Sequence, residues 1–230
     1  MTDTGTQTKA RIYLAGKRGI TASVGHTVYH TFNDGQYSAI GREPFSGIRA
    51  LNDEVLKAGM TVHHASAENS LVLLLPVIGK IKFRLGEEEG RFLDPDTSQL
   101  IYVPKDATLE ITNPYREQTI NYVLVWFQTQ PVSRYFDQFA LFDLQKKHDS
   151  LVQIFTTTQS AGYIGKFSGR SDQTFALRES AKGVLVFVLE GAFEMEKRLL
   201  EPRDALALHH LSSIEFEALS NNAILLLIEV

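Results

Sequence analysis

The residues of this chain that can hold a metal or move a proton are its histidines and acids. It has seven histidines and no cysteine, which excludes disulfides, thiolate catalysis and cysteine-based metal sites. The densest group is His63-His64 with Glu68. His64 and Glu68 have an HxxxE spacing, and imidazole with carboxylate is a donor set for iron and similar divalent metals. Adjacent histidines on a strand point to opposite faces, so only one of the two can face a barrel interior.

The remaining polar candidates favour structural roles. His30 is expected to be a buried histidine that is hydrogen-bonded to the backbone, and His26 has no clustered partner. The adjacent acids Asp53-Glu54 are interpreted as a solvated turn. The sequence contains no pair of carboxylates that stands out as an acid and a base. It also lacks a glycine-rich phosphate loop and a nucleophile elbow.

The hydrophobic pattern that must position these residues has a period of two. Polar and apolar residues alternate over 80–85 and 108–112, which predicts strands with one buried face. Denser apolar runs over 71–75 and 184–189 predict strands that are buried on both faces. Turn signals rich in Gly, Pro, Asn and Asp separate these runs. The pattern predicts an all-β fold of the sandwich or barrel type.

The two halves of the sequence repeat one order of elements, from an apolar strand through a glycine turn to further strands. The turn glycines Gly79 and Gly191 lie 191 − 79 = 112 residues apart, about half of the 230-residue chain. We therefore expect two tandem barrels with short helices. The predicted N-terminal domain spans 10–130 and the C-terminal domain 151–230. The linker 131–150 holds either a short helix or an edge strand.

Composition limits the partners and the location of the protein. With 43% hydrophobic residues, 22% charged residues and a formal net charge of -4, the chain has no basic domain, and nucleic acid is not expected as a partner. It has no apolar run of about 18 residues, so no membrane span is predicted. The polar start lacks the apolar segment of a secretory leader, and a cytoplasmic location is expected.

Several stretches resemble the cupin superfamily. Residues 188–191 (VLEG) and 200–205 (LEPRDA) are similar to the cupin pattern of a strand, its glycine turn and a Pro-Gly-Asp-type turn, with Arg203 in place of the usual glycine. The first half resembles the pirin family in particular, over residues 29–32 (YHTF), 48–55 (IRALNDEV), 58–59 (AG) and 113–114 (NP). The second half resembles the C-terminal cupin of pirin-like quercetinases and of the YhaK-type bicupins.

This resemblance implies a bicupin of two jelly-roll-like barrels. Pirin-family members typically hold one iron or a similar divalent metal in the N-terminal cupin, through an HxH pair and a later His and Glu, and some have quercetin 2,3-dioxygenase activity. In this register the four ligand positions are Ala65, Ala67, Leu109 and Ile111, none of which can donate a lone pair. The corresponding positions of the second cupin fall near Arg178, Ser180, Val184 and Ile214.

The sequence therefore predicts a pirin-like bicupin without the family metal site and without a cofactor. The expected role is that of a non-catalytic binder or sensor of a small apolar or aromatic molecule. The candidate pocket is lined by Ala65, Ala67, Leu71, Leu109 and Ile111. The alternative is a quercetin 2,3-dioxygenase-like oxidoreductase, whose iron or other divalent metal occupies a displaced site at His63, His64 and Glu68. A third hypothesis is an isomerase or another cofactor-free enzyme.

Overall fold

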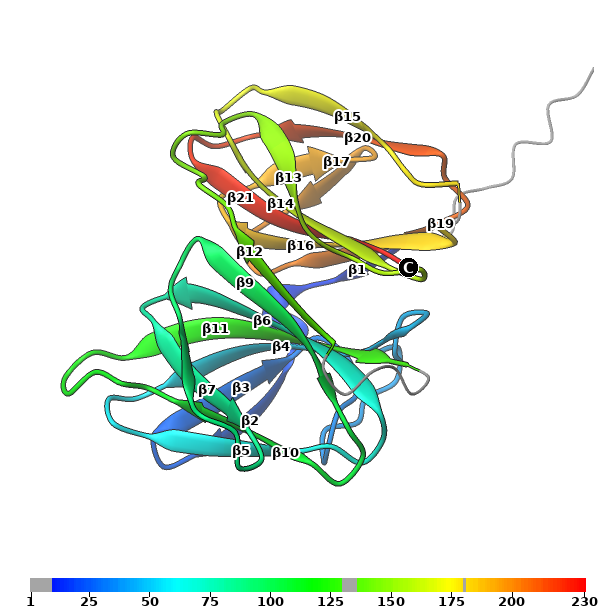
Figure 1. Cartoon of the computed structure of the whole chain (residues 1–230). Coiled ribbons are helices and arrows are strands. Elements are labelled where there is room, and N and C mark those ends of the chain that lie inside the picture. Colours follow the sequence, from blue (N-terminus) through cyan, green and yellow to red (C-terminus); the bar gives the residue numbers. More distant parts are fainter. Residues whose placement is uncertain (1–9, 130–135, 180) are drawn as a thin grey trace, which may run out of the picture. The chain divides into compact units, whose positions relative to one another are not determined.

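The computed structural model describes residues 10–129, 136–179 and 181–230, and the chain is built almost entirely of β-strands (Figure 1). Among these residues, one 3-10 turn, η1 (Ala15–Lys17), is the only helical segment. The predicted all-β class is confirmed, and the predicted short helices are reduced to this turn. Within the described part, no helix has the length and apolar character needed to cross a membrane.

The chain divides into two compact units. The first barrel comprises residues 18–142. Its strands are β2 (Gly19–Ser23), β3 (His26–His30), β4 (Ile48–Leu56), β5 (Thr61–Ala65), β6 (Ser70–Ile78), β7 (Ile81–Leu85), β8 (Arg91–Leu93), β9 (Thr97–Val103), β10 (Thr108–Thr112), β11 (Ile120–Gln128) and β12 (Asp137–Leu141). They form a seven-stranded sheet in the order β12-β9-β6-β11-β4-β3-β2 and a four-stranded sheet in the order β5-β10-β7-β8.

The second barrel combines the described residues of the N-terminal segment up to Lys17 with residues 143–230. Its strands are β1 (Ala10–Tyr13), β13 (Ser150–Thr156), β14 (Ala161–Phe167), β15 (Asp172–Ala176), β16 (Gly183–Glu190), β17 (Phe193–Met195), β18 (Arg198–Leu200), β19 (Ala205–His209), β20 (Ser213–Ala218) and β21 (Ala223–Glu229). They form a six-stranded sheet in the order β1-β19-β16-β21-β14-β13 and a four-stranded sheet in the order β15-β20-β17-β18.

The alternation of the sequence explains how each barrel acquires its core. On β7, Ile81 and Phe83 are buried while Lys82 and Arg84 are exposed. The buried pair joins an apolar cluster that fills the first barrel. A second cluster, with edge-to-face contacts among phenylalanine rings, fills the second barrel. Each cluster removes the apolar faces of two sheets from water, which is the main stabilising term of such a fold.

The predicted repeat appears as a strand-by-strand correspondence between the two barrels. Read in spatial order, β12-β9-β6-β11-β4-β3 of the first large sheet corresponds to β1-β19-β16-β21-β14-β13 of the second. The small sheets correspond in the same way. Gly79 follows β6 with a φ of 75°, and Gly191 follows β16 with a φ of 73°. Glycine adopts this left-handed backbone at little cost, which accounts for both turn glycines.

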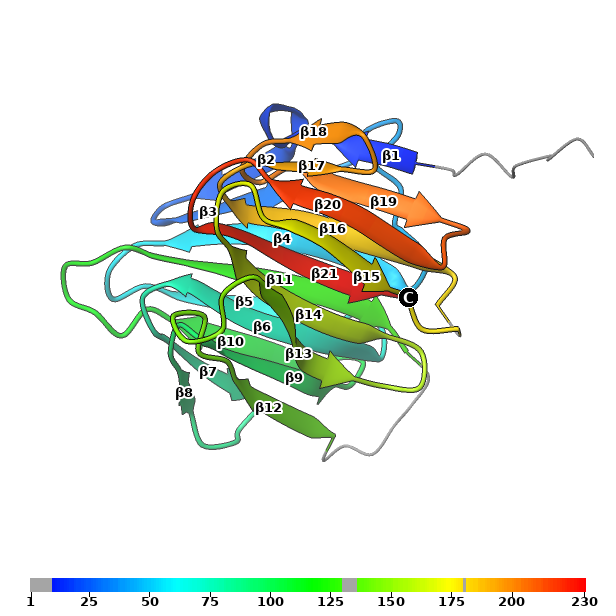
Figure 2. The ribbon, with the colours of Figure 1, turned by 90° about the horizontal axis from the view of Figure 1, so that it is seen from above.

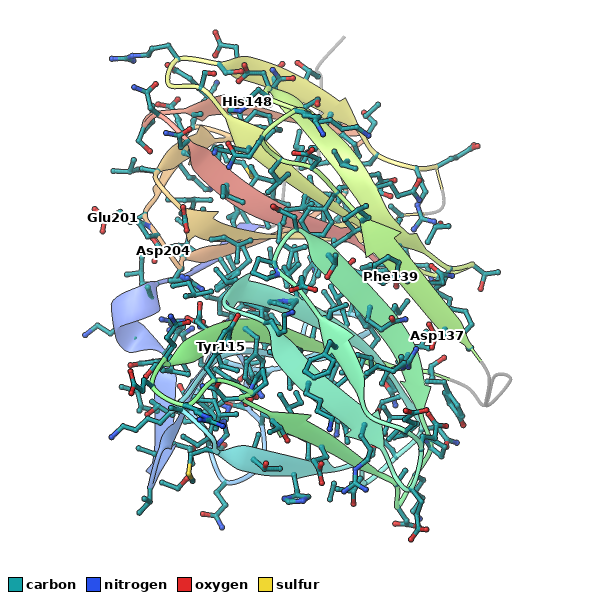
Figure 3. The ribbon with its side chains drawn as sticks, turned by 60° about the vertical axis from the view of Figure 1, so that its left-hand side comes forward. Tyr115, Asp137, Phe139, His148, Glu201 and Asp204 are labelled. Carbon is teal, nitrogen blue, oxygen red and sulfur yellow. The ribbon has the colours of Figure 1, made fainter. Side chains whose placement is uncertain are left out.

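The two repeats exchange one edge strand. β1 precedes the strands of the first barrel in the sequence but pairs with β19 of the second. β12 precedes the strands of the second barrel but pairs with β9 of the first, and Figure 2 shows β9 and β12 side by side. Asp204 anchors the segment after β1, because its carboxylate accepts the N–H of Ala15 at 2.6 Å and the N–H of Glu201 at 3.0 Å. Asp204 and Glu201 lie together in the turn before β19 (Figure 3).

The observed division therefore differs from the predicted domains at two places. The predicted first domain, 10–130, includes β1, whereas β1 pairs in the second barrel. The predicted linker, 131–150, includes β12, an edge strand of the first barrel with Asp137 and Phe139 along it (Figure 3). The middle of that linker is therefore a strand and not a helix, while residues 130–135 lie outside the described part. Order along the chain does not reveal which sheet edge a strand joins.

Removal of β1 tests the strand exchange. A chain that begins at residue 15 loses the buried Tyr13 side chain and leaves β19 as an edge. We expect the free energy of unfolding of the second barrel to fall by about 3 kcal/mol, the usual cost of losing a buried aromatic side chain. Urea denaturation and hydrogen exchange of the β19 amides measure this effect. A chain that begins at residue 10 is the control, and equal β19 exchange in the two chains would contradict the proposed role of β1.

Candidate functional site

A buried carboxylate lies on the inner face of the first large sheet. Glu54 on β4 is fully buried and stands opposite Tyr122 of β11 and Val28 of β3 in the strand register. Tyr122 belongs to the apolar core cluster, so this face of the sheet is the interior one. The interpretation of Asp53-Glu54 as a solvated turn is wrong, because both residues belong to β4 and are buried.

Three side chains from three strands converge on Glu54, and we call these four residues the Glu54 cluster. The Glu54 Oε2 atom lies 2.7 Å from His26 Nε2 and accepts the Tyr122 hydroxyl at 2.9 Å. His64 Nε2 on β5 lies 3.5 Å from the same oxygen. Among the described residues, Glu54 Oε1 and His64 Nε2 are buried without a hydrogen-bond partner. Unpaired buried polar atoms of this kind point to a bound molecule, an ion or water.

The contacts of the cluster set the charge of two of its members. Burial raises the pKa of Glu54, but the charge of His64 and the hydrogen bonds from His26 and Tyr122 outweigh burial, and the pKa of Glu54 lies below its ordinary value. Burial raises the pKa of Tyr122 well above its ordinary value, and the nearby Glu54 carboxylate raises it further. Glu54 is therefore an anion at neutral pH, and Tyr122 remains a protonated donor to it.

A second polar group packs on Trp126, whose ring also contacts His64. The β4–β11 register shifts between Trp126 and Phe127, and this irregularity leaves Arg49 of β4 without a partner in that ladder. The Arg49 guanidinium lies 5.0 Å above the Trp126 ring, and the His64 and Trp126 ring centroids are 6.4 Å apart. Arg49 Nε is 3.6 Å from Glu68 Oε1 and has no hydrogen-bond partner among the described residues. A β-bulge of this type re-aims a side chain.

The predicted displaced metal set does not come together. Only His64 faces the interior: it shares its face of β5 with Val62, which packs against the core. The His63 side chain is 62% exposed, and its Nε2 pairs with Glu110 at 3.2 Å. Glu68 faces Arg49 instead of either histidine. The adjacency argument is thus supported, and the grouping of these three residues is wrong.

Of the five predicted pocket residues, two face the barrel interior and three do not. Ala65 and Ala67 are exposed, so they do not line the barrel interior. Leu71 is buried, but on the face of β6 opposite to Val72, which packs in the core. Leu109 and Ile111 do face the interior and are fully buried in the core cluster. Counting residues from a glycine turn predicts that the two alanines face inward, and this prediction is wrong. Strand alternation predicts that the residues on β10 face inward, and this prediction is correct.

The interior of the second barrel has its own buried carboxylate. Glu229 on β21 is fully buried and accepts the Arg178 N–H at 2.7 Å and the Arg178 Nε–H at 2.6 Å. The Tyr163 hydroxyl lies 3.3 Å from it. Val184 and Ile214, two of the positions mapped onto the second cupin, are apolar core residues. Ser180 lies outside the described residues.

The prediction that His26 has no clustered partner is wrong, because it contacts Glu54 and His64, and sequence reasoning gave Tyr122 no role. The detectable signal for Glu54 was the run from Ile48 to Leu56, whose apolar ends mark a single nine-residue strand with acids inside it. His30 is buried as predicted, but its partners are the side chains of Asn52 at 3.1 Å and Thr21 at 2.9 Å. Pairing between strands that are distant in sequence brings these groups together, and no local pattern records it.

Neither a surface groove nor a metal-binding group of side chains among the described residues gives a further site that includes the Glu54 cluster. A groove of about 570 Å³ in the first barrel is lined by residues that include Arg91, Tyr102 and Asp137, and by none of the Glu54 cluster. Within the described ranges, no group of three or more His, Asp or Glu has an arrangement that could hold a metal ion. The ring centroids of His26 and His64 are 6.2 Å apart, and both Nε2 atoms face the same oxygen of Glu54.

Comparison with known proteins identifies the fold. Residues 147–230 match the family of quercetinase C-terminal cupin domains. The bacterial pirin YhhW from Escherichia coli, solved in complex with nickel(II), has a TM-score of 0.82 and 16% identity, and the match covers 96% of this chain and 99% of that one. No curated protein sequence matches the chain.

Two further solved structures are similar. YhaK from Escherichia coli has a TM-score of 0.71 and 16% identity over 86% of this chain and 92% of that one. A quercetin 2,3-dioxygenase from Acinetobacter baumannii has a TM-score of 0.68 and 13% identity over 96% of this chain and 78% of that one. At these identities the similarity concerns the fold.

The charge of Glu54 yields a pH-dependent prediction. A carboxyl whose pKa is lower in the folded than in the unfolded protein stabilises the fold above its unfolded pKa, about 4.3, and this contribution is lost as the pH falls through the folded value. We expect Glu54→Gln to lower the free energy of unfolding by about 2 kcal/mol at pH 7, the size of a hydrogen bond to a charged group. The loss should shrink below about pH 4.3.

Urea denaturation at pH 7 and at pH 3.5 measures that difference. Glu110→Gln is the matched control, because Glu110 forms an exposed ion pair with Arg84 and should contribute little at either pH. A Glu54→Gln loss of the same size at both pH values would show that Glu54 is not held as an anion.

Proposed function

Because the chain is a pirin-like bicupin, we propose that it is a small-molecule-binding protein that works without the four-ligand metal site that the pirin-family resemblance implies. It is not a metal-dependent dioxygenase on this proposal. Its ligand is a small apolar or aromatic molecule, taken up at the polar end of the first barrel.

One observation carries this proposal. Leu109 and Ile111 stand where the family resemblance expects a histidine and a glutamate ligand, and both are fully buried in the apolar core. Hydrocarbon side chains have no lone pair to give, and replacing them with ligands would require repacking the core around β10. Counting from the glycine places the other two ligands at Ala65 and Ala67, but the inward residues of β5 are Val62 and His64, so His64 is the one potential donor on the inner face of that strand. The donor set of this chain therefore does not fit the family metal.

The Glu54 cluster offers chemistry for binding. The His26 and His64 side chains are 15% and 16% exposed, so each imidazole has one edge near the surface and one edge toward Glu54. Trp126 and Met60 provide apolar surface at the same barrel core. An apolar wall with a few convergent polar groups is the usual composition of a small-molecule site.

The alternative, a metal-dependent quercetin 2,3-dioxygenase-like function, is supported by the similar structures and by the donor types in the Glu54 cluster. Two of the similar structures are described as a pirin in complex with nickel(II) and as a quercetin 2,3-dioxygenase. His26, His64 and Glu54 are two imidazoles and one carboxylate, which are donor types that suit such metals. Their present arrangement, in which one carboxylate oxygen faces both histidines, favours hydrogen bonding over coordination.

Metal content separates the two functions. Full-length protein purified from cells supplied with iron, manganese, zinc and nickel should contain far less than one equivalent of any of them. It should consume no oxygen with quercetin. Near-stoichiometric metal that is lost in His64→Gln but kept in His63→Gln would overturn the proposal, because only His64 faces the interior. Elemental analysis and an oxygen electrode provide the two measurements.

A further inference from the structure

We propose that the first barrel binds a small planar organic anion, typified by an aromatic carboxylate, at a rim site formed by Arg49, His64 and Trp126. The inference rests on the proposed small-molecule function and names the class of ligand. It concerns a group of side chains within one barrel, supplied by β4, β5 and β11.

Arg49 provides the charge for this recognition. Its position at the β4 irregularity sets the guanidinium 5.0 Å above the Trp126 ring. Its Nε is buried and makes no hydrogen bond with any described residue. A guanidinium presents its N–H groups as a planar fork that matches the two oxygens of a carboxylate. Arg49 Nε is therefore a donor without a hydrogen-bond acceptor among the described residues, although it forms a long ion pair with Glu68.

Glu68 marks the place of the missing carboxylate. Its Oε1 lies 3.6 Å from Arg49 Nε, beyond hydrogen-bond distance, and its side chain is 41% exposed. Exposed, loosely held ion pairs contribute little to stability, so a ligand carboxylate can displace this one at low cost. The Glu68 side chain thus competes with a ligand carboxylate for Arg49.

His64 and Trp126 complete the site. The buried Trp126 ring supports the Arg49 guanidinium from below, and the His64 ring lies 6.4 Å from it with a buried Nε2 that has no hydrogen-bond partner among the described residues. Glu54, His26 and Tyr122 are the charged and titratable groups close to His64, and the Arg49–Glu68 pair lies at the Trp126 ring. The negative sign of the ligand follows from Arg49, because its guanidinium stays protonated and its own partner Glu68 is no closer than 3.6 Å.

Isothermal titration of the full-length protein with three probes of similar shape tests the sign of the ligand charge. Benzoate is the anion, benzamidine the cation and benzyl alcohol the neutral compound. We expect benzoate to bind more tightly than the other two. Arg49→Gln should weaken benzoate binding by about tenfold or more, the effect of one lost charge-assisted pair. His63→Gln, which changes an exposed neighbour on the opposite face of β5, should have no effect.

Glu68→Gln is the decisive variant, because it should strengthen benzoate binding several-fold, and a gain of affinity cannot come from misfolding. Tighter binding of benzamidine than of benzoate, or an Arg49→Gln variant with unchanged benzoate affinity, would overturn the inference. Binding of benzyl alcohol without benzoate would also overturn it while leaving the proposed small-molecule function intact. Failure of that function would be seen separately, as near-stoichiometric metal in the purified protein.

Discussion

The buried carboxylate of Glu54 imposes the strictest constraint on the first barrel. A charge without solvent must be hydrogen-bonded or paired, and the partners of Glu54 come from β3, β5 and β11. β5 belongs to the small sheet and the other strands to the large one, so the two sheets must close over each other before Glu54 is satisfied. The closure is driven by the apolar cluster that fills the rest of the barrel. The interior therefore has an apolar region around β10 and a polar region around β4. The polar groups that we propose for ligand binding lie in the second region.

The exchanged strands β1 and β12 each form one edge of a large sheet. A large open sheet presents an edge of unpaired N–H and C=O groups, which invites pairing with other chains. In each barrel the strand that covers the edge comes from the sequence of the other repeat: β12 covers β9, and β1 covers β19. The first barrel is still contiguous in the sequence, over 18–142, whereas the second combines 143–230 with the segment that carries β1. Each barrel has its own apolar core, but each large sheet includes one edge strand from the other repeat.

Strand alternation predicted most of this fold, including the inward positions of Leu109 and Ile111 and the duplication marked by Gly79 and Gly191. It failed where polar residues occupy the inner face of a strand, because Asp53-Glu54 inside β4 has the composition of a turn. It also failed where spacing from a glycine replaced the face of the strand, as for Ala65 and Ala67. His26, Glu54 and Tyr122 lie up to 96 residues apart (122 − 26), and their proximity follows from strand order, which the local sequence does not encode.

The two barrels use related buried groups to different ends. Each has a fully buried glutamate that is contacted by a tyrosine hydroxyl: Glu54 with Tyr122, and Glu229 with Tyr163. In the second barrel Arg178 binds both oxygens of Glu229, and a guanidinium keeps its charge at every physiological pH. In the first barrel the partners of Glu54 Oε2 are two imidazoles and a tyrosine hydroxyl, and Oε1 has no hydrogen-bond partner among the described residues. A carboxylate with both oxygens bound serves the fold. A carboxylate with one free oxygen beside partly exposed imidazoles can accept a further hydrogen bond, which is why we propose the first barrel as the binding site.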